Sequence, residues 1–360
     1  MRKWNFNPGP ATLPLSVLKK LERNTIELDG LGMSILEISH RSKEFEAILN
    51  ETKNLYHELL GFSNDYETIF LGGGASLQFA MVPMNFLNGG VADYVITGSW
   101  SKKAYKEAKF FGNPNVAATT ENENFTRLPK EEEIKYSEKP IYIHFTSNNT
   151  IYGTQWHKFP KTPEGVPVFC DMSSDILSRR FDPKMFSLIY AGAQKNLGPA
   201  GVTLITLKKS LLSLAKEGLP TMLSYKTHIE NNSLYNTPPV YAIYVVKLVL
   251  EWAKEIGGLD EIEKRNNKKA ELLYGIIDKY PDYYKATVKD KASRSFMNVC
   301  FRMPSEELEA KFIKEATSSG FHGLKGHRSV GGIRVSMYNA MEVEGIEKLC
   351  QFMEDFKKKN

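Results

Sequence analysis

Six short apolar runs recur between residues 68 and 207 of this 360-residue chain, and helical or loop segments separate them. The runs cover residues 68–71, 94–96, 141–145, 166–170, 188–191 and 202–207. They are too short for buried helices and have no polar face, which is typical of strands covered by helices on both sides. Their alternation with helical segments predicts an α/β fold in which helices flank a mostly parallel sheet.

Helix signals surround these strands. Pro14 can begin a helix without leaving an amide unpaired, and Ser42 can cap a second one. A longer helical run over residues 241–256 ends at a pair of glycines, a common helix stop. Residues 119–140 are rich in Glu, Asn, Lys and Pro, and we expect a surface excursion there rather than a domain boundary.

The pattern beyond the glycine pair predicts a smaller C-terminal α/β domain. Its expected elements are a helix over 259–280, a strand over 296–302, a helix over 305–318, a strand over 332–337 and a terminal helix. We therefore expect a large domain over residues 1–257 and a small domain over residues 258–360. The first 13 residues could pack on the small domain.

Composition excludes several classes of protein. No apolar run approaches the roughly 20 residues that a membrane-spanning helix needs. Three cysteines are too few and too scattered for a disulfide framework, and no metal site is indicated, so we expect a cytoplasmic protein. The net charge of +5, from dispersed basic residues, allows anionic small substrates without indicating nucleic-acid binding.

A glycine-rich turn, residues 72–76 with the sequence GGGAS, follows the first apolar run and precedes an expected helix. Such a turn exposes unpaired amides at the positive end of the helix dipole, which suits a phosphate group. The turn matches neither the GxxxxGK[ST] nor the GxGxxG pattern, so it is no nucleotide P-loop and is a weak dinucleotide signal. A tight turn without a ligand remains the alternative.

Three more residues follow other strands. Asp171 ends the fourth run, Lys195 follows the fifth, and Trp100 lies just after the second. Taken singly, they could be a helix cap, a solvated lysine and a core tryptophan. Asp171 and Lys195 are 24 residues apart, about one βαβ crossover, so both side chains can reach one crevice at the strand ends. Together with the phosphate turn they provide what pyridoxal phosphate needs: a lysine, an acid for the ring nitrogen and an aromatic face.

Longer motifs resemble a known enzyme family. They spread from Asn5 to Ala340 and read NFNPGPATLP, EISHRSKEF, LGGGASLQF, TGSWSKKA, TSNNTIYGTQW, FCDMSSD, YAGAQKNLGPAGV, NTPPVYAIY and GHRSVGGIRVSMYNA. These motifs resemble the phosphoserine aminotransferases, which belong to the class V branch of fold-type I pyridoxal-phosphate enzymes. The resemblance implies the fold-type I architecture, pyridoxal 5'-phosphate as cofactor, and a homodimer with active sites at its interface.

The resemblance also implies roles for the matching cofactor residues. Lys195 would form the Schiff base with pyridoxal phosphate, and Asp171 would pair with the ring nitrogen. Trp100 would stack on the ring, and Thr150 would lie beside its polar edge. The residues implied to hold the cofactor phosphate are Ala75, Ser76 and Gln194, with Asn236 and Thr237 contributed to the site of the neighbouring subunit.

Two His-Arg pairs and one further arginine are candidates for substrate binding. An acid group at each end of a substrate favours a planar, bidentate arginine at each end. The resemblance assigns Arg334 to the α-carboxylate, and closure of the two domains could gather the rest around the distal group. The residues implied for that distal group are His40, Arg41, His327 and Arg328.

The implied reaction transfers an amino group between L-glutamate and 3-phosphonooxypyruvate. Its products would be O-phospho-L-serine and 2-oxoglutarate, formed by a ping-pong mechanism in serine biosynthesis. The resemblance also allows 4-phosphohydroxy-L-threonine, a compound of pyridoxine biosynthesis. Ser76 and Pro8 differ from the residues of some family members. An alanine–glyoxylate aminotransferase is the alternative enzyme, and a binding protein without turnover is the alternative to an enzyme.

Overall fold

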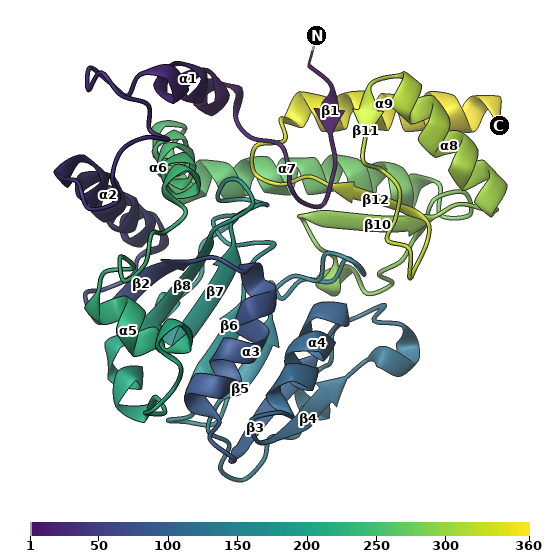
Figure 1. Cartoon of the computed structure of the whole chain (residues 1–360). Helices are drawn as coiled ribbons and strands as arrows, with labels where there is room; N and C mark the ends of the chain where they lie inside the picture. Colours follow the sequence, from purple (N-terminus) through teal and green to yellow (C-terminus); the bar gives the residue numbers. More distant parts are fainter. Residues whose placement is uncertain (1) are drawn as a thin grey trace.

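A seven-stranded sheet forms the centre of the computed structural model, which describes residues 2–360 (Figure 1). Its strand order is β2-β8-β7-β6-β5-β3-β4. The neighbours from β4 to β7 pair in parallel, whereas β8 runs antiparallel to both β7 and β2. The strands are β2 (Tyr66–Leu71), β3 (Val91–Ile96), β4 (Asn113–Thr119), β5 (Ile143–Thr146), β6 (Val168–Asp171), β7 (Leu188–Gly192) and β8 (Thr203–Lys208). The prediction of a mostly parallel sheet is confirmed.

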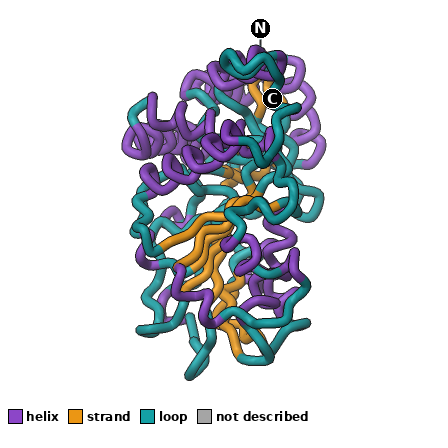
Figure 2. The backbone as a smooth tube through the Cα atoms, turned by 60° about the vertical axis from the view of Figure 1, so that its left-hand side comes forward, coloured by secondary structure: helices purple, strands orange, loops and turns teal. Residues whose placement is uncertain are grey.

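Helices cover both faces of this sheet, so that the strands lie between two helical layers (Figure 2). Alternate side chains of a strand point to opposite faces. Phe70 packs into the core that contains α2 and α6, whereas Ile69 packs into the core that contains α3 and α4. The helices of this part are α1 (Leu15–Ile26), α2 (Lys43–Leu60), α3 (Gly74–Phe86), α4 (Ser99–Ala108), α5 (Tyr225–Glu230) and α6 (Val240–Glu255).

Most elements lie within two or three residues of their predicted positions. The expected cap of α2 is present, because the Ser42 side chain accepts a hydrogen bond from the Phe45 amide. Residues 119–140 hold two short 3-10 turns and loops, as expected of a surface excursion. The strand β4 was not predicted, because it lies at the sheet edge and its sequence, NPNVAAT, has few apolar residues.

A second, three-stranded antiparallel sheet lies above the first in Figure 1, with the order β12-β10-β9. The N-terminal β1 pairs with β11, and Phe6 is buried in the core of this C-terminal part. The helix α7 contributes Leu259 to the core around α2 and Leu273 to the C-terminal core, so it spans both. The elements are β1 (Trp4–Asn5), α7 (Gly258–Lys279), β9 (Lys285–Ala286), β10 (Asn298–Arg302), α8 (Glu306–Ser318), β11 (Phe321–His322), β12 (Ile333–Ser336) and α9 (Val343–Lys359).

The division into domains at residue 257 stays a prediction. No helix within residues 2–360 combines the length and apolar character that crossing a bilayer would require.

Candidate active site

A cavity of about 270 Å³ lies at the carboxyl ends of β5, β6 and β7, where the C-terminal sheet faces the large one. Nine of its lining residues are among those predicted from the sequence: Ala75, Ser76, Trp100, Thr150, Asp171, Gln194, Lys195, His327 and Arg334. These residues come from distant parts of the chain. The connections between the strands of the sheet therefore bring these predicted residues together at one cavity.

The glycine-rich turn opens α3 at the edge of this cavity. Gly73 has a φ of +83°, which favours glycine, and a Cβ atom there would lie 2.6 Å from the Leu77 side chain. The backbone can turn this tightly only without a side chain at that position. Ala75 and Ser76, in the first turn of α3, line the cavity. Their amides have no partner within the helix, so they can bind an anion.

Asp171 is the last residue of β6 and is 95% buried, with a relative exposure of 5%. Its Oδ1 accepts a hydrogen bond of 2.9 Å from the Ser173 amide. Burial raises the pKa of the Asp171 carboxyl, while the Ser173 hydrogen bonds and the positive charge of Lys195 act in the opposite direction. A cationic group in the cavity would hold this carboxyl in its charged form.

Lys195 follows β7, and its Nζ donates a hydrogen bond of 2.9 Å to the Thr150 hydroxyl. Burial lowers the pKa of the Lys195 ammonium to about 8, with Asp171 opposing the shift and Arg334 adding to it. The amine can therefore be neutral near physiological pH, which nucleophilic attack and proton transfer both require. Gly9 packs close by, since a Cβ there would lie 3.4 Å from the Lys195 Cγ.

Arg334 reaches the same cavity from β12. It is buried, its Nη1 lies 3.5 Å from the Thr150 carbonyl oxygen, and its Nε has no partner among the described residues. A buried guanidinium with a free nitrogen favours an anionic ligand. His327 lines the cavity beside it, and burial together with the charges of Arg334, Arg328 and Lys103 lowers the pKa of its imidazole.

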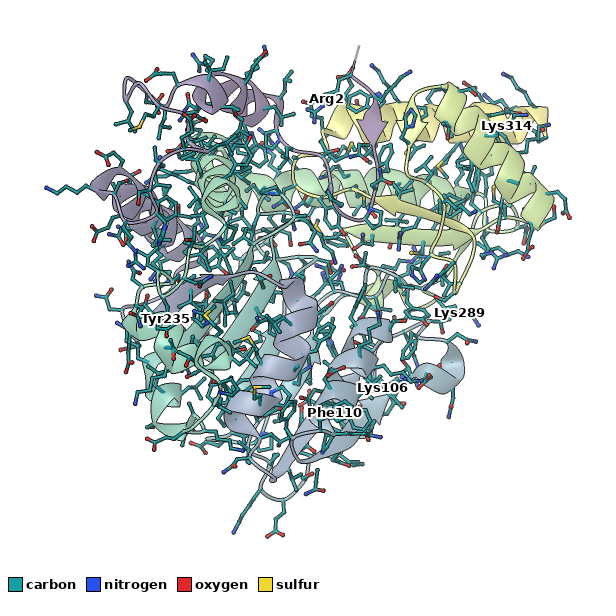
Figure 3. The ribbon with its side chains drawn as sticks, viewed as in Figure 1. Arg2, Lys106, Phe110, Tyr235, Lys289 and Lys314 are labelled. Carbon is teal, nitrogen blue, oxygen red and sulfur yellow. The ribbon has the colours of Figure 1, made fainter. Side chains whose placement is uncertain are left out.

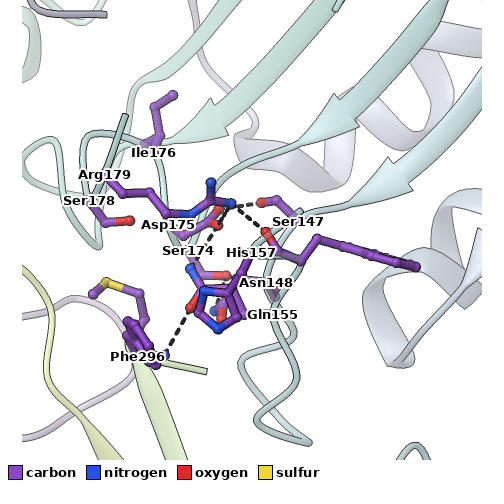
Figure 4. A network of polar contacts seen from close by, with 12 residues as sticks. Ser147, Asn148, Gln155, His157, Ser174, Asp175, Ile176, Ser178, Arg179 and Phe296 are labelled. Carbon is purple, nitrogen blue, oxygen red and sulfur yellow. Dashed lines mark hydrogen bonds and ion pairs between the residues drawn. The ribbon is translucent and has the colours of Figure 1, made fainter. Parts of the chain in front are cut away.

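A second buried carboxylate, that of Asp175, lies at the centre of a network of polar contacts in the segment that follows Asp171 (Figure 4). Asp175 accepts hydrogen bonds from Ser147 and from Gln155, the latter at 3.1 Å, and forms an ion pair of 3.6 Å with Arg179. The Gln155 side chain also accepts a hydrogen bond of 2.9 Å from the Phe296 amide. The network thus ties the segment after Asp171 to β5 and to the C-terminal part.

Five of the predicted residues lie outside the cavity lining: His40, Arg41, Asn236, Thr237 and Arg328. His40 Nδ1 lies 3.3 Å from the Thr237 hydroxyl, so the segments around residues 40 and 237 form one cluster. Figure 3 shows the neighbouring Tyr235 at the edge of the molecule, where 46% of its surface is exposed. Within a single chain, the structure does not bring this cluster to the cavity.

Sequence reasoning did not identify other lining residues, among them Phe79, Asn148, Ser173 and Ser174. The sequence does mark Ser173 as a candidate, because it lies two residues after an aspartate at the end of a strand. Its hydroxyl accepts a hydrogen bond of 3.0 Å from the Gly192 amide, just before Lys195. Phe79 and Asn148 have no comparable signal, because a helix phenylalanine and a loop asparagine occur in any protein of this size.

Comparison with known proteins gives consistent results over the whole chain. The model of the class-V aminotransferases matches residues 3–349. A phosphoserine aminotransferase from Desulfosudis oleivorans is 54% identical over 362 residues, which cover 100% of this chain and 99% of that protein. The phosphoserine aminotransferase structure from Bacillus circulans subsp. alkalophilus has a TM-score of 0.97 and 52% identity, with 99% of both chains covered. The structure of a PLP-bound phosphoserine aminotransferase from Trichomonas vaginalis has a TM-score of 0.93 and 35% identity, with 98% of this chain and 100% of that chain covered. The chain therefore belongs to the phosphoserine aminotransferases, within the class-V aminotransferase family.

Proposed function

We propose that this chain, with pyridoxal 5'-phosphate as cofactor, transfers the amino group of L-glutamate to 3-phosphonooxypyruvate. The products are 2-oxoglutarate and O-phospho-L-serine, and the reaction serves serine biosynthesis in the cytoplasm. The observation that carries the proposal is the convergence of Lys195, Asp171 and Arg334 on one cavity. The alanine–glyoxylate alternative loses its support, because relatives about half identical over the full length are phosphoserine aminotransferases.

The residues of the cavity fit the cofactor. Trp100 presents an indole whose buried Nε1 has no partner among the described residues, and its ring can cover a flat heterocycle. The amides of Ala75 and Ser76, with Gln194, suit the phosphate. The Asp171 carboxylate suits a protonated ring nitrogen. When bound, pyridoxal phosphate supplies an electron sink for the cleavage of the substrate Cα–H bond.

Lys195 is the proton carrier in this scheme. When neutral, its Nζ would take the proton from the substrate Cα atom and pass it to the cofactor within the same half-reaction; in the second half-reaction it would move a proton in the opposite direction, to the Cα atom of the new amino acid. The lowered pKa of the ammonium, about 8, keeps a useful neutral fraction near pH 7.5. Thr150 holds Nζ in place through its hydroxyl at 2.9 Å. Because the amino group would stay on the enzyme-bound cofactor after 2-oxoglutarate leaves and before 3-phosphonooxypyruvate binds, we expect ping-pong kinetics.

We assign Arg334 to the α-carboxylate of both substrates. We assign the distal carboxylate or phosphate to His327, which lines the cavity, and to Arg328, the next residue along the chain. The same cavity would accept 4-phosphohydroxy-L-threonine, because this compound carries the same two anionic ends.

We further propose a homodimer in which the cluster of His40, Arg41, Asn236 and Thr237 completes the cavity of the neighbouring subunit. The contact between His40 and Thr237 means that these two segments would arrive together. The cluster adds a cationic arginine to a site that binds a phosphate, and it would contact the cofactor phosphate through Asn236 and Thr237. The exposed apolar side chains near it, including Leu36 and Tyr235, support burial against a second copy.

The direct test is an absorption spectrum of the purified, cofactor-loaded protein. Addition of L-glutamate should remove the visible band, and addition of 3-phosphonooxypyruvate should restore it. The Lys195→Ala variant should lack both the band and turnover. A band that responds to L-alanine and glyoxylate but not to the phosphorylated substrate would contradict the proposal.

A further inference from the structure

Three consecutive carbonyl groups in the loop behind Asp171 each bind an asparagine side chain. The Ile176 carbonyl accepts a hydrogen bond of 3.0 Å from Asn196 Nδ2. The Leu177 carbonyl accepts one of 2.9 Å from Asn339 Nδ2, and the Ser178 carbonyl accepts one of 2.9 Å from Asn266 Nδ2. We call Asn196, Asn266 and Asn339 the asparagine triad. All three are buried, with exposures of 5%, 2% and 6%.

The members of the triad also bind one another. Asn266 Nδ2 donates a hydrogen bond of 2.9 Å to Asn339 Oδ1. The backbone N–H of Asn339 donates one of 3.0 Å to Asn196 Oδ1. A primary amide has two donors and one acceptor oxygen, so these bonds leave each side chain little freedom to rotate. The three carbonyls and three side chains therefore form one connected polar unit, in which the Asn266 Oδ1 atom alone has no partner among the described residues.

The backbone that the triad binds is strained. Leu177 has a φ of +62°, in the left-handed region that a leucine rarely adopts. Such a conformation persists only where surrounding contacts over-determine it. The hydrogen bonds to the carbonyls at 176, 177 and 178 provide those contacts. Side-chain amides from three separate segments therefore bind one short turn, which is more hydrogen bonding than a surface loop requires.

The triad joins the segments that carry the reacting groups. Asn196 is the residue after Lys195, and the bound turn begins five residues after Asp171. Asn339 lies five residues after Arg334, and Asn266 belongs to α7. None of the three asparagines lines the cavity, so they can act only through other residues.

The buried Lys269 strengthens the same arrangement from one turn further along α7. Its Nζ donates hydrogen bonds of 2.9 and 2.8 Å to the carbonyls of Met337 and Tyr338, and its side chain is fully buried. The segment that carries Asn339 is therefore fixed on α7 at two successive points, Lys269 and Asn266. Movement of this segment would move Asn196 and the turn together.

We propose that the asparagine triad positions the reacting groups. It fixes the segments that carry Lys195, Asp171 and Arg334 relative to one another, where the two sheets meet. The proposal rests on the function proposed above. Misplacement of a reacting group by about 1 Å can lower a rate by about 100-fold. Loss of one triad member should therefore lower kcat and change the environment of the Lys195 amine, beyond any loss of stability.

The test compares Asn196→Ala and Asn339→Ala with Asn85→Ala. Asn85 is equally buried and also binds two carbonyls, those of Met81 and Leu223, at 2.8 Å, but it lies on α3 away from the cavity lining. Three quantities are measured on the cofactor-loaded proteins: kcat, Tm and the pH midpoint of the visible absorption band. The midpoint reports the environment of the Lys195 nitrogen. A change in stability alone would not shift this midpoint.

We expect each triad variant to lower kcat at least about 10-fold and to shift the pH midpoint by about half a unit or more. Asn85→Ala should lower Tm to a similar extent with kcat within twofold and the midpoint unchanged. If a triad variant does not fold, Asn266→Ala, the member farthest in sequence from a reacting group, takes its place. Triad variants that match Asn85→Ala would overturn the positioning role alone. Wild-type protein without a band would overturn the proposed function as well.

Discussion

At the scale of single residues, the cavity places charged groups where burial disfavours their charged forms. Burial raises the pKa of the Asp171 carboxyl and lowers the pKa of the Lys195 ammonium. Each shift is opposed by the other group, so the two charges depend on each other. A cationic cofactor ring beside Asp171 would leave that carboxylate charged and free Lys195 to lose its proton. The pair is thus suited to a bound cation more than to an empty cavity.

Lys103 gives a prediction about substrate charge. Its Nζ lies over the Trp100 ring, 4.4 Å from the centroid, and the described residues include no carboxylate within ion-pair distance. The lysine therefore adds free positive charge beside the cavity. Lys103→Ala should lower kcat/KM roughly threefold for 3-phosphonooxypyruvate at low salt, and less for glutamate, because the phosphate carries about two negative charges.

The matched control is Lys109→Ala. Lys109 lies 4.7 Å from the Tyr105 ring centroid near the other end of α4, so this variant removes the same charge and the same kind of contact. Steady-state kinetics over a range of salt concentrations checks the prediction, since screening should abolish the effect. Equal losses for both lysine variants, or a loss that salt does not change, would contradict it.

Site residues that directly follow a strand could be predicted from the sequence. Residues whose role depends on a hydrogen bond to a distant part of the chain could not. Asp171 and Lys195 each follow a buried strand, and the crossover rule relates their positions. Nothing in the local sequence relates Asn196 to Asn339, which are 143 residues apart and hydrogen-bonded. Asparagine is a common loop residue, so its function becomes visible only when its partners are known.

At the scale of elements, the start of α3 shows how one turn serves both folding and binding. Gly73→Ala should lower the affinity for pyridoxal phosphate at least about 10-fold, because the added Cβ must displace Leu77 and the amides that follow. Gly61→Ala is the control. Gly61 ends α2 with a φ of +74°, and its nearest contact to an added Cβ is 4.0 Å away.

Both glycine variants should lose about 1 kcal/mol of stability from backbone strain, and Gly73→Ala should lose more because its Cβ atom also meets Leu77. Urea unfolding of the cofactor-free proteins measures both losses. Absorption titration with pyridoxal phosphate should then separate them, because only Gly73 precedes amides that line the cavity. Unchanged affinity in Gly73→Ala would mean that these amides do not hold the phosphate.

The helix α7 gives a prediction about pH. Burial lowers the pKa of Lys269 from its ordinary 10.5 to about 7. Between these two pH values the unfolded chain binds a proton that the folded chain has released, so the free energy of unfolding should rise with pH. Relative to Lys269→Met, the rise in the wild-type protein should approach about 1.4 kcal/mol per pH unit above pH 7.

Urea unfolding of the cofactor-free proteins at pH values from 7.5 to 8.5 measures this difference. The contribution of Lys195 is common to both proteins and cancels. Parallel stability curves for the two proteins would show that Lys269 titrates near its ordinary value.

At the scale of the whole molecule, what the sequence could not predict is how the parts meet. Hydrophobic periodicity predicted most strands and helices, because each pattern is local. The reversed direction of β8 and the edge strand β4 were missed, since direction and sheet order are set by contacts between segments. The same limit applies to the cluster of His40 and Thr237, which joins residues 197 positions apart.

The position of this cluster outside the cavity gives the last prediction. In a twofold-symmetric dimer, each cavity would take Lys195 from one chain and Arg41 from the other. Lys195→Ala and Arg41→Ala homodimers should both be nearly inactive toward 3-phosphonooxypyruvate. A heterodimer of the two variants, purified through two different tags, would contain one cavity with both changes and one cavity with neither. It should therefore recover about half of the wild-type activity per dimer. If Arg41 instead served the cavity of its own chain, every cavity of the heterodimer would carry one change, and no activity beyond that of the parents would appear.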